Sequence, residues 1–178
     1  MTKFGTVKTI DVSRYKRFAL VADTHGMFDS TINASLRDFD YVIHAGDLGG
    51  WKILNAANPR LLAVCGNNDV MEKWPDEELA KLRQLPSVLK LKLKGGFLVV
   101  THGHQFPAVA TRHQKLRATF PYAKAILYGH SHRAVVDKTS SPWIINPGAS
   151  GNVRCHGGPS FITLSISGSG WRIRKISI

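Results

Sequence analysis

Cysteine, acidic side chains and long apolar segments are all scarce in this chain of 178 residues. Its two cysteines are Cys65 and Cys155, and neither belongs to a C-x-x-C motif, which excludes a disulfide framework. No apolar run approaches the roughly 18 residues that a membrane span needs. The first residues of the chain also lack the apolar core of a signal peptide. We therefore expect a cytoplasmic protein that has no membrane partner.

The shortage of acidic residues gives the chain a net charge of +12, from 24 Lys and Arg against 12 Asp and Glu. A basic protein attracts polyanions. The basic residues are spread along the chain, however, and in residues 89–94 they alternate with leucine as on a half-exposed strand. No known nucleic-acid-binding motif is visible. We interpret the charge as a solvated basic surface and keep nucleic acid as an alternative partner.

The apolar residues, 43% of the chain, are enough for one folded domain that comprises residues 1–178. Short apolar runs, each followed by glycine or polar residues, predict buried strands. These runs are residues 17–22, 40–45, 60–65, 96–101, 125–128 and 141–148. Further strands are expected at 88–94, 160–166 and 171–178, and helices at 30–39, 76–85 and 107–120. Because several links are short, part of the sheet must be antiparallel. The pattern predicts an α/β fold with mixed sheets.

Side chains that bind metal ions follow five of these runs. They occur in Asp23-Thr24-His25, Gly46-Asp47, Gly66-Asn67-Asn68-Asp69, His102-Gly103-His104 and His130-Ser131-His132. Ligands of open α/β sheets sit beyond the carboxyl ends of strands, so we expect these groups to meet. Each group alone is a weak signal, whereas five in succession indicate a metal site. The other histidines, His44, His113 and His156, are interpreted as ordinary hydrogen-bonded residues.

The motifs "DTHG", "GDLGG", "GNND", "THGH" and "GHSH", followed by "INPGAS", resemble those of calcineurin-like metallophosphoesterases. The resemblance covers about residues 17–150 and points to the small, single-domain phosphodiesterase branch. It implies a four-layer α/β/β/α sandwich, in which two mixed β-sheets are flanked by helices. It also implies two divalent metal ions. One would be held by Asp23, His25, Asp47 and His132, and the other by Asp47, Asn67, His102 and His130.

The oxygen and imidazole ligands of this set suit Mn, which is our first expectation, or Fe, Ni, Co or Zn. A structural zinc site would be expected to use thiolates. The resemblance further implies hydrolysis of phosphodiesters by a hydroxide that bridges both metals, since metal binding lowers the pKa of water toward about 7. Asp69 would orient a ligand or a histidine of the site.

The chain departs from the family pattern at Asn68, where many relatives have a histidine that helps the leaving group and small members often have cysteine. Asparagine cannot act as an acid, although it can bind a phosphate oxygen. We therefore expect diesters with good leaving groups as substrates, a nucleotide among them. His104 is the best nearby proton donor, or else it supports a ligand. Arg154 is a second candidate for binding the substrate phosphate, and Asn146 and Ser150 are weaker ones.

Two other functions are compatible with the same motifs. The family resemblance includes a retromer subunit of this fold that has lost metal-binding residues and works by binding partners. A scaffold of that kind is one alternative, although all seven ligand residues are present here. A nuclease is the other, because the backbone of a nucleic acid is a phosphodiester and the chain is basic.

Overall fold

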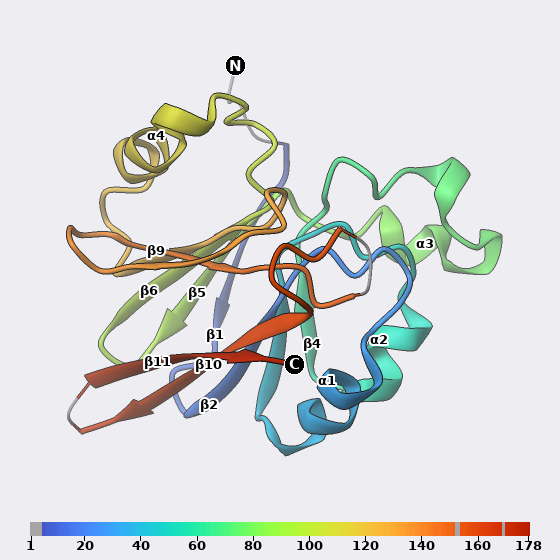
Figure 1. Ribbon diagram of the computed structural model, residues 1–178, viewed down its shortest axis with the longest axis horizontal. Helices are drawn as coiled ribbons and strands as arrows, with labels where there is room; N and C mark the ends of the chain where they lie inside the picture. Colours follow the sequence, from blue (N-terminus) through green and yellow to red (C-terminus); the bar gives the residue numbers. More distant parts are fainter. Residues whose placement is uncertain (1–4, 152–153, 169) are drawn as a thin grey trace.

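Two β-sheets packed face to face form the centre of the molecule (Figure 1). The computed structural model describes residues 5–151, 154–168 and 170–178. One sheet has six strands in the order β1 (Val7–Asp11), β5 (Val88–Leu93), β6 (Gly96–Thr101), β7 (Ala125–Leu127), β9 (Trp143–Pro147) and β8 (Ala134–Asp137). The other has five strands in the order β11 (Gly170–Ser177), β10 (Ser160–Ser167), β2 (Arg17–Val21), β3 (Tyr41–His44) and β4 (Leu61–Ala63). Both sheets mix parallel and antiparallel pairs, as predicted.

The largest group of buried apolar side chains lies between the two sheets. Alternate residues of each strand point into it, because successive side chains of a strand face opposite sides. In β2, Phe18 and Leu20 face this interior, whereas Ala19 and Val21 face outward. In β5 the leucines are buried and Lys92 is exposed, as the alternation of the sequence predicts.

Helices cover the outer faces of both sheets. Three lie over the five-stranded sheet, namely α1 (Ser30–Ser35), α2 (Lys52–Ala57) and α3 (Leu79–Leu82). One, α4 (Arg112–Thr119), packs Leu116 against the outer face of the six-stranded sheet. The layers are therefore α/β/β/α, which confirms the predicted fold class (Figure 1).

The predicted helices are present, but they are shorter than expected. Short 3₁₀ turns replace part of each, at Leu36–Asp38, Asp76–Glu78 and Val109–Thr111. At the start of α1, the Asp29 carboxylate accepts hydrogen bonds from the N–H groups of Thr31 and Ile32, as a helix cap does.

Three elements were not predicted, namely β1, β8 and α2. The two strands lie at the edges of the six-stranded sheet, and most of their residues are exposed or only half-buried. β1 therefore lacks the apolar run that marks a buried strand, and the run in β8 is only three residues long, Ala134 to Val136.

The parallel strands bring the polar loops together. In one sheet β2, β3 and β4 are parallel neighbours, and in the other β6, β7 and β9 are. The carboxyl ends of each parallel set consequently lie at one edge of its sheet. The five polar motifs follow the ends of β2, β3, β4, β6 and β7. In the described part of the chain, no helix is long and apolar enough to cross a membrane.

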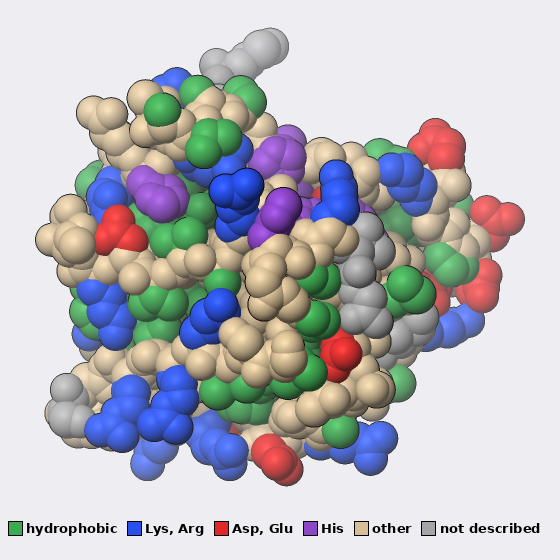
Figure 2. Space-filling view, in the orientation of Figure 1, with side chains coloured by type: hydrophobic (Ala, Val, Ile, Leu, Met, Phe, Trp, Pro, Cys, Tyr) green, Lys and Arg blue, Asp and Glu red, His purple; other side chains and the backbone are tan. Residues whose placement is uncertain are grey.

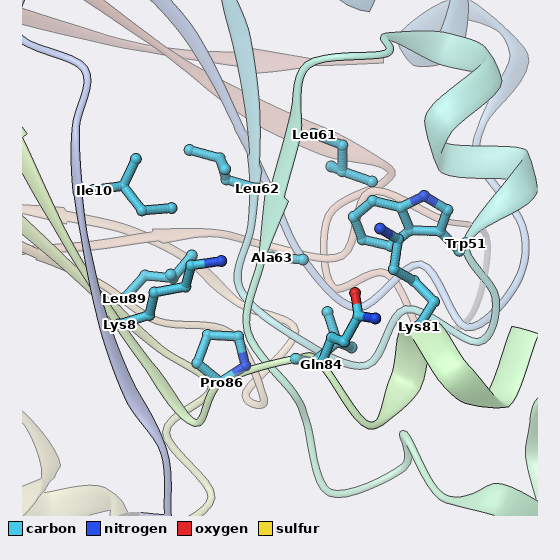
Figure 3. Close-up of a pocket in the computed structure, with 11 residues that line it drawn as sticks. Lys8, Ile10, Trp51, Leu61, Leu62, Ala63, Lys81, Gln84, Pro86 and Leu89 are labelled. Atoms are coloured by element: carbon cyan, nitrogen blue, oxygen red, sulfur yellow. The ribbon is translucent and has the colours of Figure 1, made fainter.

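A small, mostly apolar groove lies elsewhere, at the open side where β1 and β4 form the edges of the two sheets (Figure 3). Its volume is about 150 Å³. Ile10, Leu62 and Leu89 line it, together with Lys8 and Lys81. None of the predicted site residues takes part in this groove.

Candidate metal centre

Four side chains from three loops converge beyond the ends of β2, β3 and β7. One potential ligand atom from each of Asp23, His25, Asp47 and His132 lies within 4.8 Å of the others. His25 Nε2 is 3.4 Å from His132 Nε2 and 3.8 Å from Asp47 Oδ2. His132 Nε2 is 3.5 Å from Asp23 Oδ1. These are the four residues that the family resemblance implies for the first metal ion.

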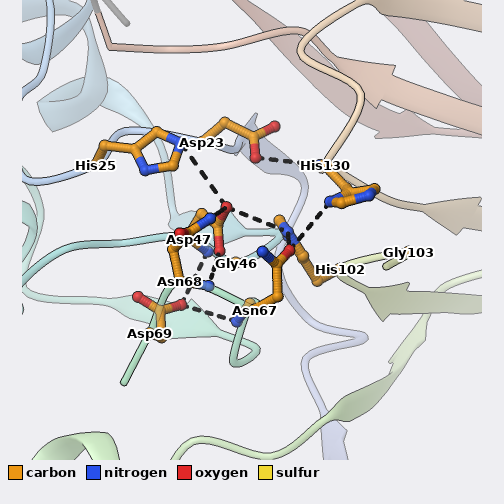
Figure 4. A network of polar contacts seen from close by, with 12 residues as sticks. Asp23, His25, Gly46, Asp47, Asn67, Asn68, Asp69, His102, Gly103 and His130 are labelled. Carbon is orange, nitrogen blue, oxygen red and sulfur yellow. Dashed lines mark hydrogen bonds and ion pairs between the residues drawn. The ribbon is translucent and has the colours of Figure 1, made fainter. Parts of the chain in front are cut away.

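A second group adjoins the first (Figure 4). Asn67 Oδ1 lies 3.1 Å from His102 Nε2 and 3.1 Å from His130 Nδ1. His102 Nε2 is 3.4 Å from Asp47 Oδ2. Asp47 Oδ2 therefore faces imidazole nitrogens of both groups, His25 on one side and His102 on the other. A carboxylate in this position can be shared between two cations.

The backbone of this region is strained. Five of the seven candidate ligands have left-handed φ angles, namely Asp23 (53°), His25 (48°), Asp47 (58°), His130 (66°) and His132 (54°). Among the described non-glycine residues, Arg154 (53°) is the other example. Such a conformation costs about 1 kcal/mol or more per residue. Strained residues that gather at one place indicate a functional site rather than a purely structural one.

Glycines allow the loops to approach one another closely. A Cβ atom on Gly66 would lie 2.2 Å from Asp47 Oδ1, and one on Gly46 would lie 2.7 Å from His102 Nδ1. Gly46 also has a φ of 93°, which other residues rarely adopt. A larger residue at position 66 would displace Asp47, and one at position 46 would displace His102.

The donor atoms fit a cation. His102 Nδ1 donates to the Ala45 carbonyl oxygen at 2.8 Å, so Nε2 faces the oxygens of Asp47 and Asn67. Burial opposes a charge on this ring, but the hydrogen bond to Asp47 and the charges of Asp23 and Asp47 raise the pKa of His102, so without a metal ion Nε2 holds a proton that a cation would replace. Lone pairs that face one another require a proton or a cation between them. Asp23 Oδ2 is buried and has no hydrogen-bond partner in the described residues, and a buried carboxylate oxygen is costly unless it is paired.

The charges of the site follow from burial and from neighbouring groups. Burial raises the pKa of Asp23 to about 7. Burial acts in the same direction on Asp47, but the hydrogen bond and charge of His102 outweigh it and lower the pKa of Asp47 below its usual value. Burial lowers the pKa of His130 to about 4, so its imidazole is neutral at pH 7 and can bind a metal ion.

Asp69 holds the two ligand loops through their main chain. Its carboxylate accepts hydrogen bonds from the N–H groups of Asp47, Leu48, Gly49 and Gly66, at 2.8 to 3.2 Å, and from the Trp74 indole at 3.1 Å. Asp69 is 5% exposed, so these contacts are shielded from water. The sequence predicted that Asp69 would orient a ligand, and the contacts act on the backbone of Asp47 rather than on an imidazole.

Asn68 is turned toward Asp47. Its backbone N–H and its side-chain amide donate to the two carboxylate oxygens of Asp47, both at 2.8 Å. Its side-chain oxygen accepts a 2.6 Å hydrogen bond from Lys73 Nζ. Sequence reasoning missed Lys73, which lies five residues farther along in a short 3₁₀ turn (Met71–Lys73), and nothing in its spacing marks it.

His104 and Arg154, the candidate proton donor and phosphate-binding residue, lie at the margin of the two ligand groups. The ring centroid of His104 is 5.5 Å from that of His102 and 6.3 Å from that of His130, and the ring is half-buried. Arg154 is exposed. Burial is the main cause of the lowered pKa of His25, and the charge of Arg154 adds to it. At Asp23 the charge of Arg154 only opposes the rise in pKa that burial causes. Figure 2 shows Lys and Arg side chains on both sides of the surface histidines.

Asn146 and Ser150 are fully buried and cannot bind substrate as supposed from the sequence. The Asn146 amide donates to the Gly129 carbonyl oxygen at 2.8 Å and to Ser131 Oγ at 3.0 Å, which holds the loop that carries His130 and His132. Ser150 Oγ donates to the Ser160 carbonyl oxygen at 2.8 Å.

The histidines outside the motifs agree with their interpretation where the structure gives their contacts. His44 is fully buried between Thr24 Oγ1 at 2.9 Å and the Gly46 N–H at 3.1 Å, and burial lowers its pKa to about 3. His113 Nε2 lies 2.9 Å from the Tyr128 hydroxyl oxygen. His44 thus supports the ligand loops as a neutral imidazole.

Comparison with known proteins identifies the superfamily of the chain. Residues 17–169 match the family model of the calcineurin-like phosphoesterase superfamily domain, and the chain belongs to this superfamily. No curated protein matches the sequence. The fold is similar to that of a predicted phosphoesterase from Streptococcus pneumoniae, with 20% identity and a TM-score of 0.64 over 91% of this chain and 89% of that chain.

Two further structures show the range of the fold. Vps29 from Entamoeba histolytica in complex with zinc has 15% identity and a TM-score of 0.65, over 90% of this chain and 98% of that chain. An archaeal phosphodiesterase has 21% identity and a TM-score of 0.62, over 90% of this chain and 99% of that chain. At these identities the likeness establishes the fold, and activity has to be argued from the residues.

A first prediction concerns the stability of the folded chain. Manganese or zinc added to chelated protein is expected to raise Tm by roughly 5–10 °C, because a cation at 100 times its Kd stabilises the native state by about 2.7 kcal/mol. Thermal unfolding with and without EDTA checks this shift. His132→Ala, which removes one member of the first group, is expected to lose most of it. A wild-type Tm that does not respond to either metal would contradict a metal site.

Proposed function

We propose that the protein is a phosphodiesterase that uses two divalent metal ions, manganese being the first expectation. The observation that supports this most directly is the Asp47 carboxylate, which stands between two groups of imidazole nitrogens. Such a pair of cations would supply positive charge for the phosphoryl oxygens and a water of lowered pKa. Metal binding alone does not distinguish an enzyme from a scaffold, since a Vps29 structure also contains zinc.

The residues of this chain would hold and orient the reacting groups. The Ala45 carbonyl oxygen fixes the His102 ring so that Nε2 points into the site. Asp69 keeps the main chain of Asp47 in place. Arg154, whose charge already reaches Asp23 and His25, would bind a phosphate oxygen of the substrate. Asn68 would hold Asp47 and present only its remaining hydrogen-bonding capacity to substrate.

A panel of substrates tests the proposal. Protein freed of metal by chelation is supplied with Mn, Ni or Zn and assayed on phosphomonoesters, nitrophenyl diesters, cyclic nucleotides, RNA and DNA. We expect metal-dependent turnover that is highest on nitrophenyl diesters, because their leaving groups need no proton. Activity that survives complete chelation would overturn the two-metal mechanism. Absence of turnover with every metal would favour the scaffold function instead.

Lys73 is expected to be a positioning residue for Asp47. Lys73→Ala should lower kcat/KM on a nitrophenyl diester roughly tenfold, because it releases the Asn68 amide that bonds Asp47 Oδ2. Lys73→Arg should restore much of the rate, since an arginine can also donate to Asn68. Lys52→Ala is the matched control, because Lys52 is exposed and paired with Glu77. Equal rates for Lys73→Ala and Lys52→Ala would exclude this role.

His104 is expected to assist the leaving group. Its half-buried ring lies next to His102 and His130, and its Nδ1 is buried without a partner among the described residues. His104→Ala should slow hydrolysis of diesters with alkoxide leaving groups by roughly 10²-fold and affect nitrophenyl diesters far less. His113→Ala, a histidine bonded to Tyr128, is the control. An unchanged rate on the alkoxide diesters would remove His104 from this role.

A further inference from the structure

The outer face of the β10–β11 hairpin is polar toward the hairpin tip, whereas Phe161 and Ile176 on the same face pack with α1. In β10, Ile162, Leu164 and Ile166 are buried against the other sheet, so the alternate residues point outward. These outward residues of β10 and β11 line a shallow groove of about 400 Å³, and they are Thr163, Ser165, Ser167, Arg172 and Arg174. Figure 2 shows Lys and Arg side chains gathered over this hairpin, which Figure 1 places at the lower left.

The strand register arranges these side chains in rows. Arg172 of β11 pairs with Ser165 of β10, and Ser165 pairs on its other side with Arg17 of β2. Paired residues lie on the same face of a sheet, about 4.8 Å apart from strand to strand. A hydroxyl thus stands between two guanidinium-bearing residues. Arg174 pairs with Thr163 in the next row.

The positive charge of this face has little compensation. Arg172 and Arg174 form no ion pair with the acidic residues that the structure describes. Asp40 lies near Arg17 and accepts hydrogen bonds from the backbone N–H groups of Lys16 and Arg17. The lining of the groove itself contains no carboxylate.

We propose that this arginine and hydroxyl face, formed by Arg17, Thr163, Ser165, Ser167, Arg172 and Arg174, binds the sugar–phosphate backbone of a nucleic acid. Arginine, serine and threonine are side chains that contact phosphate oxygens. The groove has no aromatic residue on which a base could stack, so binding is independent of sequence. The groove also has no apolar side chain that could insert into a membrane. Its concave surface can accommodate a nucleic-acid strand better than a flat lipid bilayer.

This surface is separate from the metal centre. Arg17 begins β2, whereas Asp23 follows its end, so six residues of extended chain, roughly 20 Å, separate the two. Binding at this surface would not require a phosphate at Asp47. The inference therefore goes beyond the proposed hydrolysis, and either can fail without the other.

Binding of a fluorescein-labelled 20-nucleotide polyuridylate, followed by anisotropy in EDTA at several salt concentrations, tests the proposal. EDTA prevents metal-dependent hydrolysis of the probe. Arg172→Gln combined with Arg174→Gln is expected to weaken binding roughly tenfold or more and to reduce the magnitude of the slope of log K against log salt by about 1.4, because each contact with a single strand contributes about 0.7. Both side chains are exposed, so Tm should not change. Ser165→Asp, which places a carboxylate between Arg172 and Arg17, should weaken binding as well.

The control is a double variant with the same loss of charge at a distance. Lys8 lies on β1 and Lys115 on α4, and both are exposed. Lys8→Gln combined with Lys115→Gln should reduce binding far less. An equal loss in both double variants would show that the net charge alone attracts the probe and would overturn the proposal. Absence of binding, or binding of phosphatidylserine vesicles with the same dependence on Arg172 and Arg174, would overturn it too.

Discussion

Asp47→Ala is expected to lower kcat on a nitrophenyl diester by roughly 10³-fold or more. Metal ions contribute several kcal/mol of charge stabilisation in the transition state, and about 1.4 kcal/mol corresponds to a factor of ten. Asp47 Oδ2 lies within 3.8 Å of His25 and 3.4 Å of His102, so its removal affects both metal positions together. Initial rates at saturating manganese, together with the metal content of the purified variant, measure the effect.

Asp11→Ala provides the matched control for this variant. Asp11 also accepts hydrogen bonds, from the backbone N–H and hydroxyl of Ser13, and pairs with Lys92, but it is exposed on β1. It should retain both full activity and bound metal. The Tm of metal-free Asp47→Ala separates loss of the site from loss of the fold. An Asp47→Ala protein that still binds two equivalents of metal and turns over normally would refute the proposed mechanism.

Much of the fold could be predicted because buried strands have a recognisable local pattern of apolar residues in the sequence. An apolar run that ends in glycine or a polar residue marks β2, β3, β4, β6 and β7 without any knowledge of their neighbours. The convergence of the loops then follows from one rule, that parallel strands end at the same edge. The edge strand β1 was not predicted because an exposed strand has no apolar run, and β8 was not predicted because its run, Ala134 to Val136, is only three residues long.

The supporting contacts of the site could not be predicted, because they depend on how loops from different strands meet. Nothing near Asn68 in the sequence shows that Lys73 reaches its side-chain oxygen. The same holds for Asn146, which lies within β9, whereas His130 follows β7; its amide still holds the loop of that histidine. The left-handed backbone of Asp23 and Asp47 is likewise a product of the assembled loops.

The departure from the family pattern at Asn68 has a structural counterpart. A histidine at this position would face the leaving group, whereas the asparagine bonds both oxygens of Asp47. Its remaining acceptor is occupied by Lys73. Under the proposed function, diesters whose leaving groups need no proton are therefore expected to react fastest.

Asp69→Ala is expected to cause the largest loss of stability, about 3–5 kcal/mol. Five N–H donors, four of them on the main chain, lose their acceptor at once, and a buried donor without a partner costs about 1–3 kcal/mol before water or relaxation compensates. Urea unfolding in EDTA measures this loss, since metal binding then contributes nothing to the free energy of unfolding.

Asp29→Ala is the control variant against which the loss of stability in Asp69→Ala is compared. Asp29 also accepts two backbone N–H groups, but it does so at the exposed start of α1, where loss of a cap costs about 1 kcal/mol. Asp69→Asn, which keeps one carbonyl oxygen, should fall between the two. The metal affinity of the Asp69 variants should also decrease, by roughly 10–100-fold, because the main chain of Asp47 is no longer held. If Asp69→Ala destabilises the protein no more than Asp29→Ala does, the Asp69 carboxylate does not hold the ligand loops together.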